Sequence, residues 1–273
     1  MQWWQNIYQN FDPVAFNLGG IAVHWYGIMY ALSLITAIAV AHWIVKKDNL
    51  DITKGQLDSY IWWVEIGVVL GARLGYILFY DPNTIYYLSH PWQIFNPFDH
   101  NGNFVGISGM SYHGAVIGFI IASYLWAKKA KISFFFITDI AVIAIPFGYV
   151  FGRIGNFLNQ ELVGRVTEQP WGIYVDGVIR HPSAIYEAIL EGVIVFVILY
   201  AIRKRKQFDG ELAIAYVILY SIGGIIAEFF REPDPQLGFL FGTDWLTMGI
   251  LISAIFAVLC FIFYLKFIQK KSV

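Results

Sequence analysis

The chain has 273 residues, of which 58% are hydrophobic and only 14% are charged, and its formal net charge is −1. Together with a mean hydropathy of +0.59, this composition excludes an ordinary soluble domain, whose apolar stripes would alternate with charged faces. It is typical of a polytopic membrane protein.

Apolar segments recur along the whole chain, most of them near the roughly 20 residues that a helix needs to cross the hydrocarbon core of a bilayer. From these segments we predict an all-α polytopic membrane protein with about seven transmembrane helices, forming a single integral membrane domain over residues 1–273. The expected spans are 21–45, 57–80, 113–127, 134–156, 183–202, 211–231 and 245–266.

The basic residues indicate the orientation of these spans. In this arrangement every lysine and the run 203–206 fall on one side of the membrane. The positive-inside rule makes that side cytoplasmic, so we expect the N-terminus outside and the C-terminus in the cytoplasm. Two outer segments, 81–112 and 157–182, are then long enough to fold on the membrane surface, where their Trp and Tyr rings suit the headgroup layer.

Arginine is the only basic residue type within the membrane or on the outer side. Because a guanidinium stays charged and grips phosphate oxygens through two parallel hydrogen bonds, an outer boundary of this kind favours a phosphate-binding site. The alternative is that each arginine pairs with a glutamate and only makes burial tolerable, Arg73 with Glu65 first among them. The five arginines are Arg73, Arg153, Arg165, Arg180 and Arg231.

Two outer boundaries early in the chain carry polar clusters. His24-Trp25-Tyr26-Gly27 opens the first span, and the glycine-rich segment 108–115 leads into the third span. His113 lies in this segment at the depth expected for Arg153, and a histidine with a pKa near ~6.5 is suited to accept a proton at neutral pH. The alternative is a histidine satisfied at the interface and without catalytic work.

The densest polar run stands at the outer end of the fourth span, where residues 152–164 read Gly-Arg-Ile-Gly-Asn-Phe-Leu-Asn-Gln-Glu-Leu-Val-Gly. Helical spacing places Arg153 and Asn156 on one face, with Gln160 behind them. Polar groups at such a depth are costly and usually mark a functional site, so we predict a polar cradle open to the outside. The alternative is a capped helix end whose Asn side chains bond exposed carbonyls.

Later spans add further outward polar residues at helical spacing. Glu187 and Glu191 share one face of the fifth span, after His181-Pro182-Ser183, and Glu228 and Arg231 share one face of the sixth, which also carries Tyr220. Each pair by itself is weak support for a site.

These motifs together resemble the prolipoprotein diacylglyceryl transferases. The segment 152–164 matches in full the signature of that family, Gly-Arg-x-Gly-Asn-Phe-x-Asn-x-Glu-x-x-Gly, and the likeness extends over nearly the whole chain. The other matching segments are Asp12-Pro13-Val14-Ala15-Phe16, Trp25-Tyr26-Gly27, Gly71-Ala72-Arg73-Leu74-Gly75-Tyr76, Tyr112-His113-Gly114, His181-Pro182-Ser183 with Tyr186-Glu187, and Glu228-Phe229-Phe230-Arg231.

The resemblance implies transfer of a diacylglyceryl group from phosphatidylglycerol to the lipobox cysteine of a prolipoprotein, with release of glycerol phosphate. It implies a multi-pass protein of the bacterial cytoplasmic (inner) membrane, with seven spans, periplasmic surface segments and an active site toward the periplasm. It also implies no metal and no organic cofactor. The expected partners are phosphatidylglycerol, the lipobox segment and membrane lipids, and no nucleic acid.

The resemblance also assigns roles to residues. His113 is the implied base for the cysteine thiol, and Arg153 is the implied catalytic group that stabilises the departing phosphate. The positions that match the phosphatidylglycerol site are Arg153, Tyr26, Asn156, Glu161, Gly164, Tyr220, Glu228 and Arg231.

Two departures from the family pattern stand out. His113-Gly114-Ala115 replaces the usual His-Gly-Gly, a change of one methyl group. In the sixth span, the pattern Tyr-x-x-x-Arg-x-x-x-Glu aligns with Tyr220, Gly224 and Glu228, so that glycine replaces arginine. Either a neighbour such as Arg231 takes over part of the work of that arginine, or activity is altered.

Two other functions stay open at this stage. A lipid or peptide transporter would explain several spans with buried charges, although no pair of broken spans recurs in two equivalent halves. A non-catalytic phospholipid-binding relative would keep the arginine cradle and lack the base.

Overall fold

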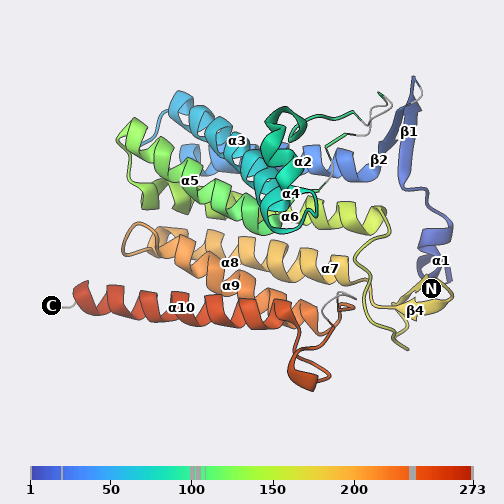
Figure 1. The fold of residues 1–273 in the computed structure, drawn as a ribbon. Coiled ribbons are helices and arrows are strands. Elements are labelled where there is room, and N and C mark those ends of the chain that lie inside the picture. The colour runs from blue at the N-terminus through green and yellow to red at the C-terminus, as the bar shows by residue number, and fades with distance from the viewer. Residues whose placement is uncertain are drawn as a thin grey trace. The chain divides into compact units, whose positions relative to one another are not determined.

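The computed structural model describes residues 2–19, 21–98, 102, 106–107, 109–233 and 238–271. Over these residues the chain is mostly helical (Figure 1). Six helical segments are long and apolar enough to cross a membrane, which confirms a polytopic membrane protein. They are Trp25–Asp48, Lys54–Phe79, Phe134–Leu158, Ser183–Arg205, Glu211–Glu228 and Met248–Phe267.

The expected third span forms a helix but is not one of these six. Helix α5 runs over Tyr112–Ala130 and covers the predicted segment 113–127. Its apolar stretch is bounded by His113 and Lys128, so it is shorter than the ~20 residues of a full span. The seventh span therefore remains a prediction.

The chain forms two compact units. Unit 1 comprises residues 1–48 and 139–273, and unit 2 comprises residues 49–138. Each unit is described by itself below.

Unit 2 is built on the pair α3 (Lys54–Phe79) and α5. Helix α3 begins with a capping box, in which the Thr53 side chain accepts from Gln56 N and the Gln56 side chain accepts from Thr53 N. The two helices approach closely through glycines four positions apart, Gly67, Gly71 and Gly75 on α3 and Gly114 and Gly118 on α5, in the manner of small-xxx-small packing. A Cβ built on Gly118 would lie 2.0 Å from the carbonyl oxygen of Gly67, so only glycine fits there.

The described part of the expected surface segment 81–112 contains α4 (Thr84–Ser89) and the 3-10 turn η2 (Pro91–Gln93). The side chain of Arg73, on α3, ties this segment down. Its Nε donates to Ile94 O over 2.6 Å and its Nη1 donates to Gly109 O over 3.2 Å. Residues 99–101, 103–105 and 108, which include Ser108 of the predicted glycine-rich segment, lie outside the described residues.

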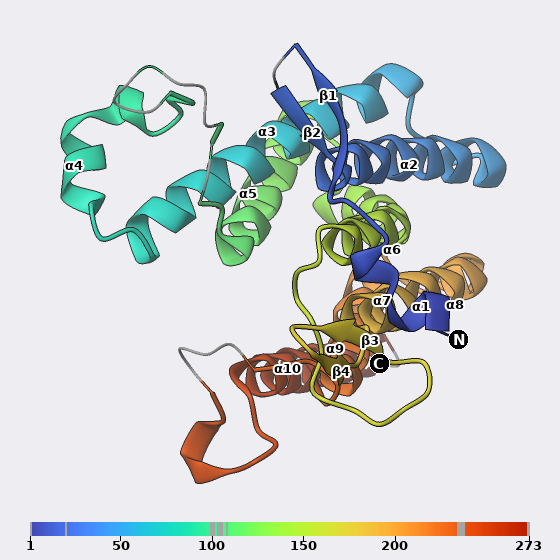
Figure 2. The same ribbon diagram turned by 90° about the vertical axis from the view of Figure 1, so that its right-hand side faces the viewer.

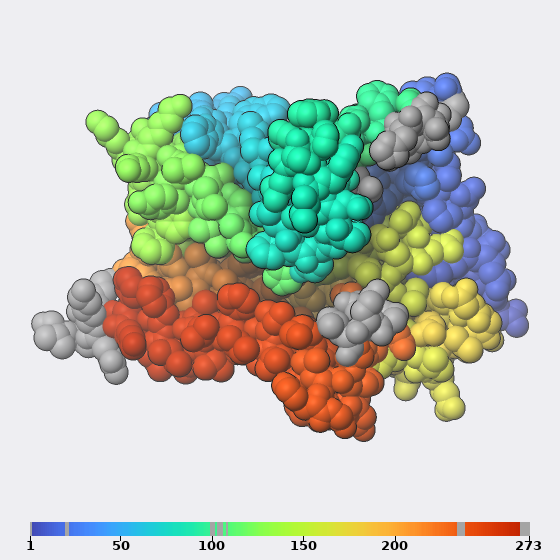
Figure 3. Space-filling model, viewed as in Figure 1, coloured from blue at the N-terminus to red at the C-terminus, as the bar shows by residue number. Residues whose placement is uncertain are grey.

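Unit 1 contains the other long helices. Helices α8, α9 and α10 lie side by side (Figure 1), and α10 lies at the surface of this unit (Figure 3). Many of its large apolar side chains are exposed, as expected of a lipid-facing helix. The elements are α2 (Trp25–Asp48), α6 (Phe134–Leu158, in unit 1 from Asp139 on), α7 (Ser183–Glu187), the π-helix η3 (Ala188–Val193), α8 (Ile194–Ile202), the 3-10 turn η4 (Arg203–Arg205), α9 (Glu211–Glu228), the 3-10 turn η5 (Leu240–Gly242) and α10 (Met248–Lys271).

Two short hairpins add strands to a chain that the sequence led us to expect as all-α. Strands β1 (Val14–Leu18) and β2 (Ile21–His24) pair antiparallel, and so do β3 (Ile173–Val175) and β4 (Val178–Arg180). The second hairpin turns at Asp176-Gly177, both with positive φ, which is the Asp-Gly signal of a tight two-residue hairpin. The fold is thus mostly helical rather than purely so.

The N-terminal segment covers one end of unit 1. Helix α1 (Gln2–Gln5) and the 3-10 turn η1 (Ile7–Gln9) lie against the β3–β4 hairpin and the end of α6 (Figure 2). The Trp4 ring stacks on Phe157 at 5.8 Å, and Trp4 Nε1 donates to Trp171 O over 2.7 Å. This packing encloses the loop that follows α6.

Basic residues gather at the opposite end of the same helices. Arg203, after α8, binds Asp48 at the end of α2, with Nε 2.7 Å from Oδ2. Lys206 Nζ lies 2.9 Å from Asp139 Oδ2 at the start of the unit 1 part of α6. The segments predicted to share the cytoplasmic side therefore meet within unit 1, while the side of the membrane that they face stays a prediction.

Candidate functional site

Arg153 lies five residues before the end of α6 and joins several polar groups of unit 1. Its Nε donates to Tyr149 Oη over 2.6 Å and lies 2.8 Å from Glu187 Oε2, and its Nη1 donates to Asn156 Oδ1 over 3.3 Å. The Glu187 side chain is almost wholly buried, at 3% exposed, whereas that of Arg153 keeps 18% of its surface accessible. Nη2 takes part in none of the hydrogen bonds or ion pairs among the described residues.

Asn156 connects this arginine to the loop after α6. Its Nδ2 donates to Glu161 Oε1 over 2.7 Å, so its amide bonds side chains on both sides. The Asn156 amide thus joins two side chains of the signature, while the cradle open to the outside stays a prediction. Glu161 stands between Gln160 and Leu162, which both have left-handed backbones with φ of 58° and 55°. Such strain at non-glycine residues is found where surrounding contacts hold a loop in place.

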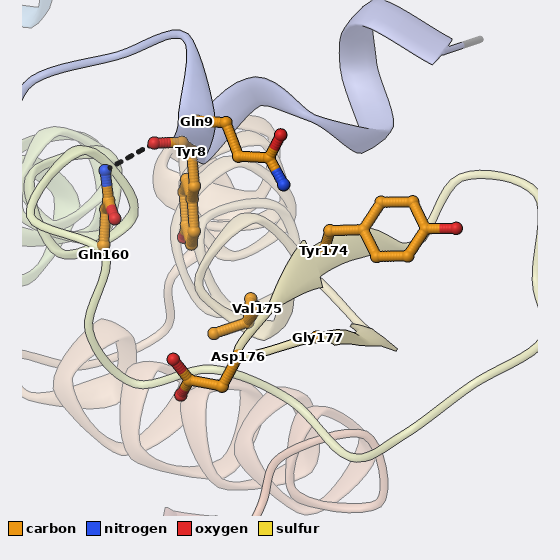
Figure 4. Close-up of a pocket in the computed structure, with 7 residues that line it drawn as sticks. All are labelled: Tyr8, Gln9, Gln160, Tyr174, Val175, Asp176 and Gly177. Atoms are coloured by element: carbon orange, nitrogen blue, oxygen red, sulfur yellow. Dashed lines mark hydrogen bonds between the residues drawn. The ribbon is translucent and has the colours of Figure 1, made fainter.

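Gln160 supplies such contacts. Its Nε2 donates to Tyr8 O over 3.1 Å and to Phe11 O over 3.0 Å, which ties the signature loop to the N-terminal segment. A cavity of 190 Å³ opens beside it (Figure 4). Burial, and then the charge of Glu161, raise the pKa of Tyr8. The cavity is lined by Tyr8, Gln9, Gln160, Tyr174, Val175, Asp176 and Gly177.

Gly164 allows the end of the signature to pass between two other segments. Its N–H donates to His181 O over 3.0 Å, and the next N–H, of Arg165, donates to Phe230 O over 2.9 Å. A Cβ on Gly164 would lie 2.4 Å from His181 O and 2.6 Å from Phe230 O, both backbone atoms. Glycine is therefore required here, and the crossing pairs Gly164 with Arg231.

Two buried carboxylates face the arginine from the fifth span. Glu187 ends α7, and Glu191 lies in the π-helical turn that follows, an irregularity frequent at functional sites. Glu191 Oε2 accepts from Tyr149 Oη over 2.6 Å, and Glu187 Oε1 lies 3.8 Å from Arg231 Nη1. The carboxylates thus bring Arg153 and Arg231 to one cluster, since Glu187 contacts both guanidinium groups.

Tyr26 approaches the same cluster from α2. A Cβ on Gly155 would lie 3.3 Å from the Tyr26 ring, so this glycine brings α2 and α6 together beside the signature. The Tyr26 hydroxyl lies within electrostatic range of Glu161 and Arg153, and the residue is 41% exposed.

Tyr220 and Glu228 lie farther out in the network. Tyr220 Oη is 3.5 Å from Tyr149 Oη, a long contact. The Glu228 carboxylate accepts from Thr247 Oγ1 over 2.9 Å. The shared helical face predicted for Glu228 and Arg231 is wrong, because α9 ends at Glu228 and Arg231 lies beyond it.

His113 belongs to unit 2, where it is exposed in the first turn of α5. Ser111 caps this helix by accepting from Gly114 N over 3.2 Å. The His113 Nδ1 atom lies 3.4 Å from Tyr80 Oη, and its ring packs edge-on against Tyr112. Its catalytic role stays a prediction.

Sequence reasoning missed two members of the unit 1 cluster. Tyr149 stands four residues before Arg153 and so on the same face of α6, a spacing that could have revealed it. Thr247 precedes α10 and no local signal connects it with Glu228, because the contact joins separate elements. Among the described residues, no group of three or more His, Cys, Asp or Glu side chains is placed to hold a metal ion.

The fold and the cluster define a multi-pass membrane protein with a polar site built around a partly exposed arginine. Comparison with known proteins makes the class specific. The chain matches the family model described as "Prolipoprotein diacylglyceryl transferase" over residues 13–266. The chain therefore belongs to the prolipoprotein diacylglyceryl transferase family.

Full-length relatives carry a more specific name. The chain is 68% identical to the phosphatidylglycerol–prolipoprotein diacylglyceryl transferase of Aliarcobacter butzleri over 100% of this chain and 99% of that protein. It is 61% identical to the protein of that name from Wolinella succinogenes, over 98% and 97% of the two chains. It is 58% identical to the protein of that name from Campylobacter lari, over 99% of this chain and 100% of that protein.

Proposed function

We propose that this protein transfers the diacylglyceryl group of phosphatidylglycerol to the lipobox cysteine of prolipoproteins. The observation that carries the proposal is Arg153, a guanidinium held at Nε by Tyr149 and Glu187 and at Nη1 by Asn156, while Nη2 remains uncommitted and the side chain partly exposed. A rigidly held cation with one free nitrogen is suited to donate hydrogen bonds to a phosphate oxygen. Family membership and the full-length relatives support the same activity.

The chemistry explains why an arginine is needed. The cysteine sulfur attacks the terminal glyceryl carbon of the diacylglycerol moiety, a C–S bond forms, and the C–O bond to phosphate breaks. The phosphate begins as a diester with one negative charge and leaves as glycerol phosphate, a monoester that carries more negative charge. A guanidinium already in place stabilises this gain of charge more than it stabilises bound lipid, which is the condition for catalysis.

The neighbouring residues hold that guanidinium and shape the headgroup site. Asn156 and Glu161 extend the hydrogen-bond chain from Arg153 toward the outer loop. Gly164 permits the crossing that brings Arg231 to the cluster. Tyr26 contributes an exposed hydroxyl-bearing ring next to both charges, while Tyr220 and Glu228 support the cluster from α9. We assign these residues to phosphatidylglycerol binding.

His113 is the proposed base that takes the proton of the cysteine thiol, whose ordinary pKa of ~8.5 leaves little thiolate at neutral pH. We expect His113→Ala to slow transfer by roughly a hundredfold to ten-thousandfold, the usual contribution of a positioned base, and to leave lipid binding largely unchanged. Raising the pH should recover part of the rate, because the thiol then ionises without help. An equal rate in the variant and wild type would remove this role from His113.

The site is proposed to face the periplasm. The cluster around Arg153 lies near one end of the unit 1 helices, and the lysine-rich residues that end α2 and follow α8 lie at the other. The positive-inside rule assigns the lysine-rich end to the cytoplasm. Phosphatidylglycerol and a prolipoprotein are then met at the outer face of the bacterial cytoplasmic membrane.

The test of the proposed function uses purified full-length protein in phosphatidylglycerol vesicles with a synthetic lipobox peptide. We expect a thioether-linked diacylglyceryl peptide by mass spectrometry, and glycerol phosphate in equal amount. A peptide with serine in place of cysteine, and vesicles of phosphatidylethanolamine alone, are the controls. Lipid binding without product would identify a non-catalytic lipid-binding protein, and lipid movement between leaflets without product would identify a transporter. Either result would overturn the proposal.

A further inference from the structure

Glu191 is a buried carboxylate whose hydrogen-bond partners are tyrosines. It is 5% exposed, and its Oε2 accepts from Tyr149 Oη over 2.6 Å. Tyr220 contributes a second hydrogen bond to the same carboxylate. A buried charged group is costly unless it is paired, so these hydroxyls are needed to keep Glu191 where it is.

The Tyr149 hydroxyl also contacts the proposed phosphate-binding group. It accepts from Arg153 Nε over 2.6 Å while it donates to Glu191. The Arg153 guanidinium lies over the Tyr149 ring as well, 4.8 Å from its centre. Because one O–H both accepts and donates, the chain Arg153–Tyr149–Glu191 polarises in one direction, and each hydrogen bond strengthens the other.

Glu191 faces Gly224, a residue of α9 that has no side chain. A Cβ built on Gly224 would lie 3.8 Å from the Glu191 carboxylate carbon, 3.9 Å from its Oε1 and 3.7 Å from Ser253 Oγ. These are ordinary van der Waals distances, so a longer side chain could begin at this position without a collision. Gly224 is also where the family pattern has an arginine. The side chain of an arginine at this position would begin beside Glu191, which is the carboxylate that the Tyr149 hydroxyl binds in this chain.

We propose that Tyr149 is a positioning residue that takes the place of the arginine absent at Gly224. Its hydroxyl binds Glu191 and orients Arg153. The single oriented guanidinium of Arg153 then does the work for which the family pattern has two arginines. Arg231 joins the same cluster through Glu187, whose Oε1 lies 3.8 Å from its Nη1. The inference rests on the proposed transfer reaction.

The experiment compares transfer by wild type, Tyr149→Phe, Gly224→Arg and the double variant, in phosphatidylglycerol vesicles with the lipobox peptide. Tyr149→Phe should lower kcat roughly tenfold to a hundredfold, the cost of a hydrogen bond to a charged group, with a smaller change in KM for the lipid. The kcat of Gly224→Arg alone should stay within a few-fold of the wild-type value. The double variant should recover most of the kcat lost in Tyr149→Phe, a coupling that independent sites would not show.

Two control variants separate positioning from general stability. Tyr124→Phe removes a hydroxyl from unit 2, outside the cluster, and should leave kcat unchanged. Gly55→Arg adds an arginine where nothing lies within 4 Å, and in the Tyr149→Phe background it should restore nothing. Thermal unfolding of each variant in detergent is measured alongside, because a merely structural role would lower the unfolding temperature without rescue by an arginine at 224.

The outcomes distinguish this inference from the proposed function. Absence of product in wild type would contradict the transfer reaction itself. Product in wild type together with an unchanged kcat in Tyr149→Phe would overturn the positioning role alone. A loss in Tyr149→Phe that Gly224→Arg fails to restore would overturn the replacement of the arginine.

Discussion

Arg153→Ala is expected to reduce diacylglyceryl transfer by at least about a hundredfold to a thousandfold and to weaken phosphatidylglycerol binding. The first effect is the usual cost of removing one preorganised donor from a site where negative charge develops. The second follows because Arg153 offers its free Nη2 nitrogen to the lipid phosphate. The variant should also be less stable, because buried Glu187 loses its nearest cation; since Arg153 is 18% exposed, the roughly 3–5 kcal/mol of a wholly buried pair is an upper bound.

Arg153→Lys separates charge from geometry. Lysine keeps the positive charge, but one ammonium cannot contact Tyr149, Glu187 and Asn156 while leaving an edge for phosphate. We expect the lysine variant to recover stability more than activity. The measurements are product formation by mass spectrometry, lipid binding by native mass spectrometry and thermal unfolding in detergent.

Arg205→Ala is the matched control for this change of charge. Arg205 is exposed at the lysine-rich end of unit 1, so its loss should leave both transfer and lipid binding close to wild type. Equal lipid binding and turnover in Arg153→Ala and wild type would remove the phosphate role from Arg153 and with it the proposed mechanism.

Gly118→Ile is expected to have the largest effect on folding. A Cβ on Gly118 would lie 2.0 Å from the backbone oxygen of Gly67 and 3.1 Å from Gly71 Cα, so the helices α3 and α5 would have to separate. Overpacking by a side chain costs about 1–3 kcal/mol where neighbours can move. Here the neighbours are backbone atoms of a packed helix, so the cost should exceed that range and the variant should accumulate poorly in membranes.

Gly55→Ala is the control on the same helix pair. Gly55 lies in the first turn of α3 with nothing within 4 Å of its Cβ position, so alanine should be tolerated or slightly stabilising. The measurement is the yield of folded protein by fluorescence-detected gel filtration and its unfolding temperature. A Gly118→Ile protein as abundant and as stable as Gly55→Ala would contradict the close helix contact.

Local sequence patterns predicted the membrane-spanning framework and the centre of the site. Long apolar segments located the six spanning helices, because a helix that crosses a bilayer must satisfy its own backbone and present apolar side chains. Within residues 152–164, Arg153, Asn156 and Glu161 lie close in sequence, and the structure joins them by direct hydrogen bonds. Contacts between residues three to five positions apart follow from helix and loop geometry alone.

Partners that come from different helices could not be read in the same way. Spacing suggested Glu228 for Arg231, yet the end of α9 separates them and Arg231 reaches Glu187. The α3–α5 contact likewise depends on glycines that are ordinary within each helix and become necessary only when two backbones meet. The Asp176-Gly177 hairpin was a local signal that the apolar pattern around it obscured.

The order of residues was sufficient for the class of protein, the approximate spans and the arginine signature, because hydropathy and short-range spacing act within one segment. Only the folded chain decided which carboxylate holds Arg153. Glu187 and Glu191 join it when α7 and the π-helical turn after α7 pack against α6, and these contacts depend on the position of one helix beside another. Tyr149, by contrast, lies one turn before Arg153 on α6 itself.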